Sequence, residues 1–382
     1  MPIALYAMAL AAFAVGTAEF IIAGLLPTLA ADLSVSIPTA GLLVTGYALS
    51  VAIGGPILAL LTAHFPRRPM ILITVALYAL GQAGCALAPN YEILMAARVL
   101  AAVTHGLFFG NATIAAASVV PFERRGAAIS IVLAGVPLAN LLGVPFGAVL
   151  GHWLGWRAAF WCIAGLGVAA FLAIAFTLPT VREEQEAVPD WRAQIRVLFR
   201  HQVALSYLTL FVLLIGVLAF VTFQVPFLIA MTGVPEAATP PYLLAYGLGA
   251  VCGIVLGGRL ADWKLMPAML GASIAYAAIS AITLLAMHSP VAMFAVMTAL
   301  GAVVYTFTVP PQTRIVHNSK GAPTLAATFI ATAFNLGYAA GALIGAALLA
   351  GGFDYWTLPV VGIVTGLGAT GITLVSWRLD KA

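Results

Sequence analysis

The stretch IALYAMALAAFAVGTAEFIIAGLL, residues 3–26, carries one charged side chain, Glu19, within an otherwise apolar run. About 20 such residues in a helix cross the ~30 Å hydrocarbon core of a membrane, because each residue adds about 1.5 Å. Glu19 would then lie ~10 Å from the outer end of that helix. We therefore expect residues 3–26 to span a membrane, with a carboxyl group held inside it.

The rest of the chain repeats this pattern of apolar runs interrupted by proline, glycine and charge. Hydrophobic residues make up 63% of the 382 residues and charged residues 7%, whereas a soluble domain needs roughly 25% charged residues. The alternating pattern of membrane strands is absent, so the spans are expected to be helices that satisfy their own backbone hydrogen bonds. Twelve are predicted, near residues 3–26, 38–62, 69–88, 92–119, 127–150, 157–178, 203–230, 241–261, 266–287, 290–313, 322–349 and 355–377.

The distribution of lysine and arginine predicts the orientation of these spans. With the N-terminus inside, the inner loops and the C-terminal tail hold 14 of the 16 basic residues, leaving Arg157 in an outer loop and Arg98 within a span. We therefore expect an even number of spans, with both termini in the cytoplasm. The 14 inner residues are Arg67, Arg68, Arg124, Arg125, Arg182, Arg192, Arg196, Arg200, Arg259, Lys264, Arg314, Lys320, Arg378 and Lys381.

The chain also divides into two similar halves, predicted as six-helix bundles at residues 1–180 and 203–382. Asn140 is followed by glycines 143, 147 and 151 in the first half, and Asn335 by glycines 337, 341 and 345 in the second. Six spans per half give both halves the same orientation, which is a parallel repeat. The linker, residues 181–202, has apolar and arginine stripes between residues 191 and 200, which predict an amphipathic helix on the inner membrane surface.

Several functional classes are excluded by missing motifs. The chain has no P-loop for ATP, no GxSxG or HExxH hydrolase motif, and no basic face interleaved with aromatics for nucleic acid. Cys85, Cys162 and Cys252 lie in apolar runs without ligand spacing and are interpreted as packing residues. We expect no enzyme activity, cofactor or metal. An ion gradient remains the ordinary energy source for moving a solute.

Three ionisable residues are expected well inside spans: Glu19, Arg98 and His105. A charge at the membrane centre costs roughly 2.5–3.5 kcal/mol, so Glu19 and Arg98 should face a cavity or each other. His105 follows Arg98 by two helical turns and shares its face. Two interpretations stay open: a proton site at Glu19 that Arg98 and His105 modulate, or a structural Glu–Arg pair beside a packing histidine.

Other polar residues within spans are candidates either for a substrate cavity or for hydrogen bonds between helices. Gln224, in "TFQV", resembles Glu19, in "TAEF", by its position in the seventh span. Glycine and proline in the fifth span predict a kinked helix that approaches its neighbour closely. The cavity candidates are Asn111, Asn140, Gln224, Tyr305, Gln312 and Asn335, and the packing motif comprises Gly135, Pro137, Gly143, Pro145, Gly147 and Gly151.

Four segments together resemble the twelve-span drug:proton antiporters of the major facilitator superfamily. "GTAEFIIAGLLPTLAADL" from Gly16 is similar to the first span of the bacterial sugar-efflux and chloramphenicol-efflux group. "ARVLAAVTHGLFFG" from Ala97 resembles the fourth-span motif, whose arginine assists proton coupling. "GVPLANLLGVPFGAVLG" from Gly135 resembles the fifth-span antiporter motif, and "GWRAAFW" from Gly155 also fits.

The loop between spans two and three departs from the family pattern. Alignment on Arg67 and Arg68 places Ala63 and Pro66 where the family carries Asp and Gly. We therefore expect the charge network of this loop either to be weakened or to be provided by the corresponding loop of the second half, which contains Asp262 and Lys264.

The resemblance implies a proton-coupled exporter of small molecules in the bacterial inner membrane. It would be an all-α membrane protein with the major facilitator fold, working by alternating access and needing no more than a monomer. The alternatives are a proton-coupled importer of a sugar or nucleoside, and a scaffold or sensor without transport.

Overall fold

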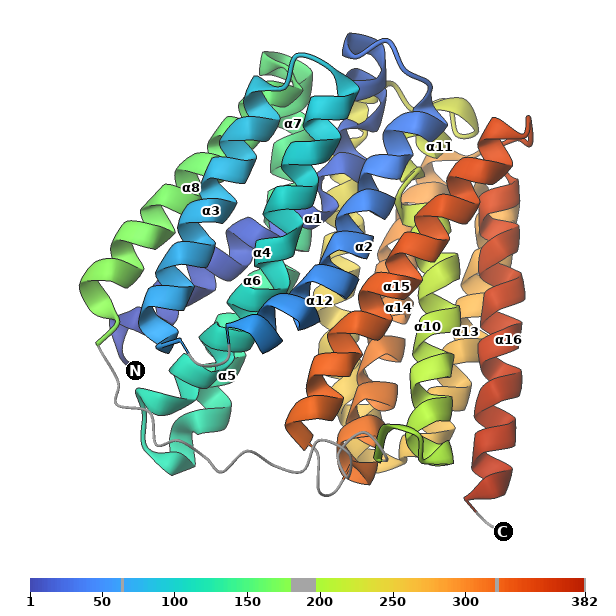
Figure 1. Cartoon of the computed structure of the whole chain (residues 1–382). Helices are drawn as coiled ribbons and strands as arrows, with labels where there is room; N and C mark the ends of the chain where they lie inside the picture. The colour runs from blue at the N-terminus through green and yellow to red at the C-terminus, as the bar shows by residue number, and fades with distance from the viewer. Residues whose placement is uncertain (63–64, 180–196, 320–322, 381–382) are drawn as a thin grey trace. The chain divides into compact units, whose positions relative to one another are not determined.

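The computed structural model describes residues 1–62, 65–179, 197–319 and 323–380, and every regular element in those ranges is a helix (Figure 1). The chain forms two compact units, Met1–Glu186 and Ala187–Ala382. The amphipathic helix predicted in the linker falls largely outside the described ranges. In each unit the long helices alternate in direction. In unit 1 we call the end at which α8 ends the linker side, and in unit 2 the end at which α10 begins. The opposite end of each unit is its far side.

Unit 1 contains α1 (Ile3–Asp32), α2 (Ile37–Leu61), α3 (Arg67–Leu87), α4 (Tyr91–Ser118), η1 (Phe122–Arg124), α5 (Arg125–Leu133), α6 (Gly135–Leu138), η2 (Ala139–Gly143), α7 (Val144–Leu154) and α8 (Trp156–Thr177). Unit 2 contains α10 (His201–Val221), α11 (Gln224–Ala230), η3 (Glu236–Ala238), α12 (Pro240–Trp263), α13 (Leu265–Ala286), α14 (Pro290–Asn318), α15 (Pro323–Ala350) and α16 (Thr357–Leu379).

In the described part of the chain, twelve helical segments are long and apolar enough to cross a membrane. This confirms the predicted all-α class and the number of spans. Helices form because each apolar segment can pair its own N–H and C=O groups in a medium that offers no other partners. Several predicted ends are wrong: α1 continues to Asp32, α14 continues to Asn318, and the helix of the seventh span ends at Val221.

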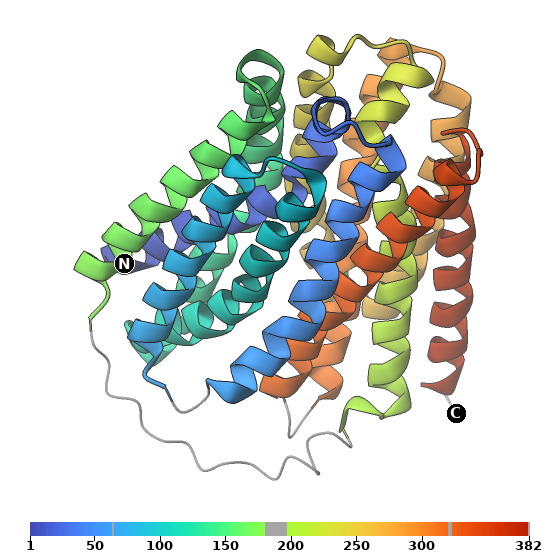
Figure 2. The same ribbon diagram turned by 45° about the horizontal axis from the view of Figure 1, so that its top comes forward.

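Unit 1 is built around α1 and α3. Helix α1 packs against α2, α7 and α8, while α3 lies between α4 and α8 (Figure 2). The fifth span is interrupted, as its prolines predict. A π-helical turn, η2, separates α6 from α7, because Pro145 has no N–H to donate to the preceding turn. Asn140 lies within that turn.

Glycines bring the fifth span against α1 at close range. A Cβ added at Gly147 would lie 2.3 Å from Ile21, and one at Gly151 would lie 2.1 Å from Leu25. At Gly135 the obstacle is backbone, the carbonyl oxygen of Ala9 at 2.5 Å. The glycine spacing therefore sets the register of the two helices.

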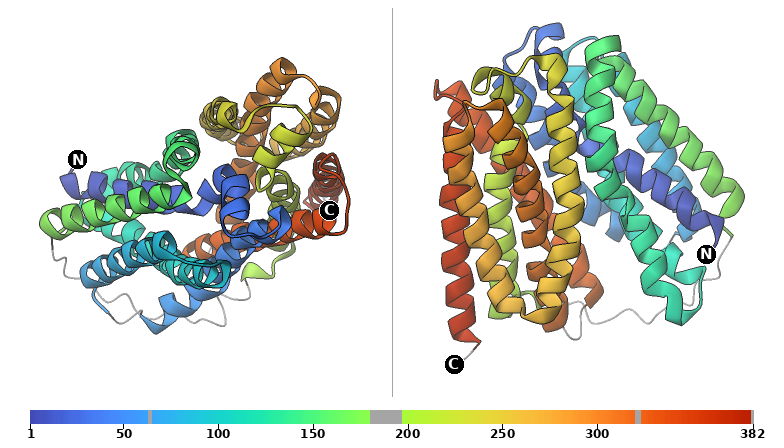
Figure 3. Two further views of the ribbon diagram at one scale, coloured as in Figure 1. Left: turned by 90° about the horizontal axis from the view of Figure 1, so that it is seen from above. Right: turned by 180° about the vertical axis from the view of Figure 1, so that it is seen from behind.

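Unit 2 repeats this packing with its own residues. Gly341 faces Ile215, and Gly345 faces Ala219. The two residues of each pair are 126 positions apart in the sequence, the same separation as between Gly147 and Ile21 in unit 1. Helices α12 and α14 also approach through glycine, at Gly253 and Gly257. Figure 3 shows α12, in yellow, running the length of the unit. The two halves therefore share one helix packing, which confirms the pseudo-symmetric bundles.

Candidate functional site

Arg98 is the polar centre of unit 1. Its side chain is fully buried on α4, and its Nη1 donates to the carbonyl oxygen of Ala18 on α1 at 3.2 Å. Its Nε donates to the carbonyl oxygen of Leu43 on α2 at 3.3 Å. The guanidinium also lies 4.6 Å from the centre of the Tyr47 ring, a cation–π contact. One side chain thus joins three helices.

Glu19 follows the residue whose carbonyl binds Arg98. Arg98 interacts with Glu19 electrostatically, but its hydrogen bonds go to backbone oxygens. Glu19 is also only half-buried, in contrast to Arg98. Its side chain therefore lies near a fixed cation and is partly exposed.

His105 belongs to the same cluster through Tyr47. Its Nδ1 lies 3.1 Å from the Tyr47 hydroxyl, and its side chain is 8% exposed. The cluster therefore runs from the Ala18 carbonyl through Arg98 and Tyr47 to His105. Sequence reasoning placed Arg98 and His105 on one face but missed Tyr47, because an aromatic residue in an apolar span packs in almost any environment.

Helix α3 adds a second set of polar groups that sequence reasoning also missed. The Tyr78 hydroxyl donates to the Ala14 carbonyl at 2.7 Å. Helices α1 and α3 run in the same direction, so Gln82, one turn after Tyr78, lies at the level of Ala18. Gln82 is fully buried, and neither its Oε1 nor its Nε2 has a hydrogen-bond partner; Nη2 of Arg98 is likewise unpaired. Unpaired polar groups are rare in protein interiors, so this level of unit 1 is unusually polar.

The two positions of unit 2 that correspond to Glu19 and Arg98 are not charged. Gly54 on α2 faces Val103 on α4, and Gly257 on α12 faces Thr306 on α14, with the same sequence separation within each pair. Helices α2 and α4 therefore correspond to α12 and α14. When the two pairs of helices are aligned in this way, Gly301 of α14 takes the place of Arg98 of α4. Helix α1 corresponds to α10 in the same way, because Gly147 faces Ile21 and Gly341 faces Ile215. This alignment places Leu213 at the level of Glu19, so the suggested likeness of Gln224 to Glu19 is wrong. Gln224 begins α11, beyond a break in the seventh span at Thr222 and Phe223.

Most of the predicted cavity amides bond to their own helices. Asn140, Gln312 and Asn335 each donate to the carbonyl oxygen four residues earlier, at 3.4, 2.7 and 3.0 Å. Gln224 is 3% exposed, and Tyr305 is half-buried. The Oε1 of Gln224 and the Oδ1 of Asn335 are buried without a hydrogen-bond partner and can accept one.

The loop motif that sequence reasoning placed in the cytoplasm differs between the two units. Arg67 donates to Oδ1 of Asn111 at 3.2 Å, so Asn111 ties α4 to the start of α3. Arg68 donates to the carbonyl oxygen of Ala175 at the end of α8. In unit 2 the matching Asp262 and Lys264 are exposed. The basic pair of unit 1 therefore connects helix ends on the linker side.

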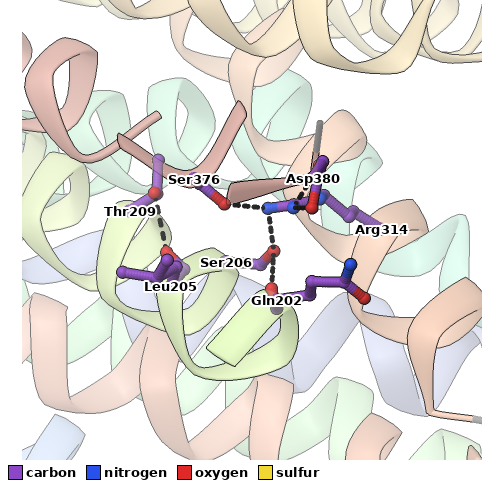
Figure 4. Close-up of polar contacts among 7 residues, drawn as sticks. All are labelled: Gln202, Leu205, Ser206, Thr209, Arg314, Ser376 and Asp380. Carbon is purple, nitrogen blue, oxygen red and sulfur yellow. Dashed lines mark hydrogen bonds and ion pairs between the residues drawn. The ribbon is translucent and has the colours of Figure 1, made fainter. Parts of the chain in front are cut away.

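Arg314 corrects a prediction, because sequence reasoning placed it in an inner loop. It lies within α14, and its side chain is 2% exposed. Its Nη2 donates to both carboxylate oxygens of Asp380, at 2.8 and 2.7 Å, and its Nη1 donates to the hydroxyls of Ser206 and Ser376 (Figure 4). The buried arginine thereby joins α14, α10 and α16 on the linker side of unit 2.

On the far side of unit 1, the segment from Gly155 provides a similar connection. The indole N–H of Trp156 donates to the carboxylate of Asp32 at 2.9 Å, and Arg157 forms an ion pair with the same carboxylate. Arg157 also donates to the carbonyl oxygen of Ala88 at 3.0 Å. Three helix ends, those of α1, α3 and α8, are held by this contact.

Comparisons with known proteins agree with this architecture. A family model described as the Major Facilitator Superfamily matches residues 8–342. The inner membrane transport protein YdhP of Escherichia coli K12 is 36% identical, over 95% of this chain and 93% of its own length. A chloramphenicol efflux pump of Mycobacterium tuberculosis is 32% identical, over 89% of this chain and 84% of its own length.

Among solved structures, a bacterial homologue of the human lysosomal transporter Spinster superimposes with a TM-score of 0.70. The superposition covers 98% of this chain and 94% of the solved chain, and the two sequences are 17% identical. At this identity the similarity shows the fold alone. The chain belongs to the major facilitator superfamily, and it is a multi-pass inner-membrane transporter of small molecules rather than an enzyme.

Proposed function

We propose that this transporter is a proton-coupled exporter of small amphipathic molecules, neutral or cationic, with both termini in the cytoplasm. The observation that carries the proposal is the cluster in unit 1: the half-buried Glu19 beside the fully buried Arg98. The export direction is supported by the relative that is an efflux pump. It is also supported by the close packing of the fifth span on α1, since that span resembles the antiporter motif.

In the proposed cycle Glu19 takes a proton when the cavity faces outward and releases it after the transporter reopens inward. Release leaves a carboxylate that favours a cationic or polarisable substrate. Arg98 modulates the proton affinity of Glu19, and His105 acts on Arg98 through Tyr47. A membrane potential of 200 mV would contribute about 4.6 kcal/mol per charge moved, enough for a concentration ratio of roughly a thousand.

In unit 2 the uncharged Leu213 and Gly301 stand in the places of Glu19 and Arg98. We infer that protons are handled by unit 1. Gln224 and Asn335, whose side-chain oxygens are free to accept hydrogen bonds, are the polar groups that unit 2 offers a substrate. One copy of the chain contains all of these groups, so a monomer suffices.

Proteoliposomes with an internal pH dye test the direction of coupling. Purified wild-type protein is exposed to gradients of chloramphenicol-like drugs, sugars and nucleosides in turn. The proposal predicts that at least one compound moving in one direction drives protons in the other. Protons moving together with the compound would make the protein an importer. No coupled flux with any compound, in protein that remains folded, would favour a scaffold or sensor.

A further inference from the structure

Unit 2 contains an apolar groove of about 310 Å³ that the transport cycle does not use. It lies between α12 and α13, with α14 as its floor. Its lining is hydrocarbon apart from the Trp263 indole and Thr306, and the Thr306 hydroxyl already donates to the Gly253 carbonyl. Water and polar solutes need hydrogen-bonding partners, so such a groove favours a hydrocarbon occupant.

Helix packing explains why the groove is open. The glycines of α12 hold it against α14, while the facing side of α13 carries only small residues. Gly271 of α13 is exposed, and a Cβ added there would meet no atom within 4 Å. Leu256 and Trp263 of α12 are 49% and 69% exposed on the opposite wall. The groove therefore opens on the surface of the chain.

The length and position of the groove match one leaflet of a membrane. On α13 it extends from Pro267 to Ala275, which is ~12 Å along a helix. Half of the hydrocarbon core is ~15 Å thick. The groove begins directly after the turn that joins α12 to α13, at the linker side, and ends near the middle of the span. An acyl chain entering from one leaflet would fill this depth.

The mouth of the groove suits an anionic headgroup. Trp263 is at the rim, where tryptophan commonly marks the membrane interface, and Nζ of Lys264 lies 5.2 Å from the centre of its ring. Arg259 is exposed one turn earlier, and Asp262 is the carboxylate between these two cations. Helix α13 starts beside Lys264 with no side-chain cap, and a helix N-terminus favours a phosphate, although Pro267 in its first turn has no N–H to donate.

We propose that this groove binds one acyl chain of an anionic phospholipid, with its phosphate at Lys264 and the start of α13. The site does not depend on the proposed export function. Phosphatidylglycerol is the probe, because it combines an acyl chain with a net negative headgroup.

Native mass spectrometry of the detergent-purified protein, titrated with phosphatidylglycerol, tests the proposal. Gly271→Leu fills the groove, and Gly371→Leu is the matched control, since Gly371 on α16 also has open space around it. We expect wild type and Gly371→Leu to retain one tightly bound lipid, and Gly271→Leu to lose it. Lys264→Gln should weaken phosphatidylglycerol about fivefold and leave phosphatidylcholine unchanged.

Equal lipid retention in Gly271→Leu and Gly371→Leu would overturn the groove as the site. Equal affinity for phosphatidylglycerol and phosphatidylcholine in wild type would overturn the anionic headgroup. A retained adduct whose mass matches a non-lipid compound would assign the groove to another apolar ligand and contradict the proposal. Lys264→Gln, on the surface, keeps the test decisive if Gly271→Leu does not fold.

Discussion

Arg98 directs its hydrogen bonds to two backbone carbonyls and its charge to the face of Tyr47. A guanidinium can do this because its donors point in several fixed directions, whereas an ammonium group is a compact point charge. The positive charge is therefore held in place without an ion pair that would lock the Glu19 carboxylate. At the scale of a single residue, the geometry of the arginine matters as much as its charge.

Arg98→Lys should consequently impair coupling although the charge is kept. Lysine cannot donate to both Ala18 and Leu43, and one unpaired buried carbonyl costs about 1–3 kcal/mol. We expect a lower thermal unfolding temperature and slower substrate-driven proton flux. Arg125→Lys, at an exposed arginine, is the control and should change neither quantity. Full flux and stability in Arg98→Lys would show that charge alone is required.

Gln82 allows stability and function to be separated. Its buried amide has no hydrogen-bond partner, so Gln82→Leu should raise the free energy of unfolding by about 1–3 kcal/mol. If the Gln82 amide also takes part in the functional site around Arg98, the same substitution should slow substrate-driven proton flux. Denaturation in detergent and flux in liposomes measure the two effects. A less stable Gln82→Leu protein would mean that the amide is satisfied in the membrane.

Some of these residues were predictable and others were not. Glu19 and Arg98 stand out in the sequence because a charge within a span is costly and rare. Arg314 does not stand out, since an arginine near the end of a span looks like any loop arginine. Its burial is decided by Ser206, Ser376 and Asp380, which come from two other helices. Such partners are set by tertiary packing and leave no local signal.

At the scale of helices, glycines at four-residue intervals determine how closely two spans approach. The partner atom differs along the α1 interface: at Gly147 it is the end of the Ile21 side chain, but at Gly135 it is backbone. A side-chain end can rotate away, whereas backbone cannot move without shifting the helix.

Gly135→Ala should therefore be more damaging than Gly147→Ala. We expect the first to cost about 1–3 kcal/mol of stability through overpacking, and to reduce transport, with a smaller effect for the second. Gly126→Ala is the control, because a Cβ there meets nothing within 4 Å. Thermal unfolding of the three variants gives the order. Equal losses at residues 135 and 147 would contradict the backbone contact.

The Arg314–Asp380 contact makes a second prediction at this scale. Asp380 accepts two hydrogen bonds from a buried cation, and its own side chain is 23% exposed. Asp380→Asn should therefore lower the free energy of unfolding by about 1.5–3 kcal/mol, the range for a hydrogen bond to a charged group. Asp262→Asn, at an exposed carboxylate, should have no effect. Matching stabilities of the two variants would mean that the pair does not hold α16.

For the whole molecule, the sequence predicts the number of spans and the repetition of six spans in each half, because both depend on local sequence patterns. Apolar length specifies a helix, and the glycine triplets recur at residues 143–151 and 337–345. The π-turn at residues 139–143 and the break in the seventh span at Thr222 and Phe223 are features that span counting does not reveal. Gln224 lies beyond that break and is not at the level of Glu19.

The two units share one packing register, yet the positions of unit 2 that correspond to Glu19 and Arg98 carry the uncharged Leu213 and Gly301. On our proposal, this asymmetry is the basis of coupling. Glu19→Gln keeps the size of the side chain and fixes it in an uncharged form. It should therefore leave the exchange of a neutral substrate intact while removing the response to protons.

Proteoliposomes that exchange labelled substrate, with and without an imposed pH gradient, measure this directly. Wild type and the control Glu123→Gln, at an exposed carboxylate, should be accelerated by the gradient. Glu19→Gln should exchange a neutral substrate at a rate near that of wild type and show no acceleration. Acceleration of Glu19→Gln equal to that of wild type would contradict the account, because the proton would then travel by another group.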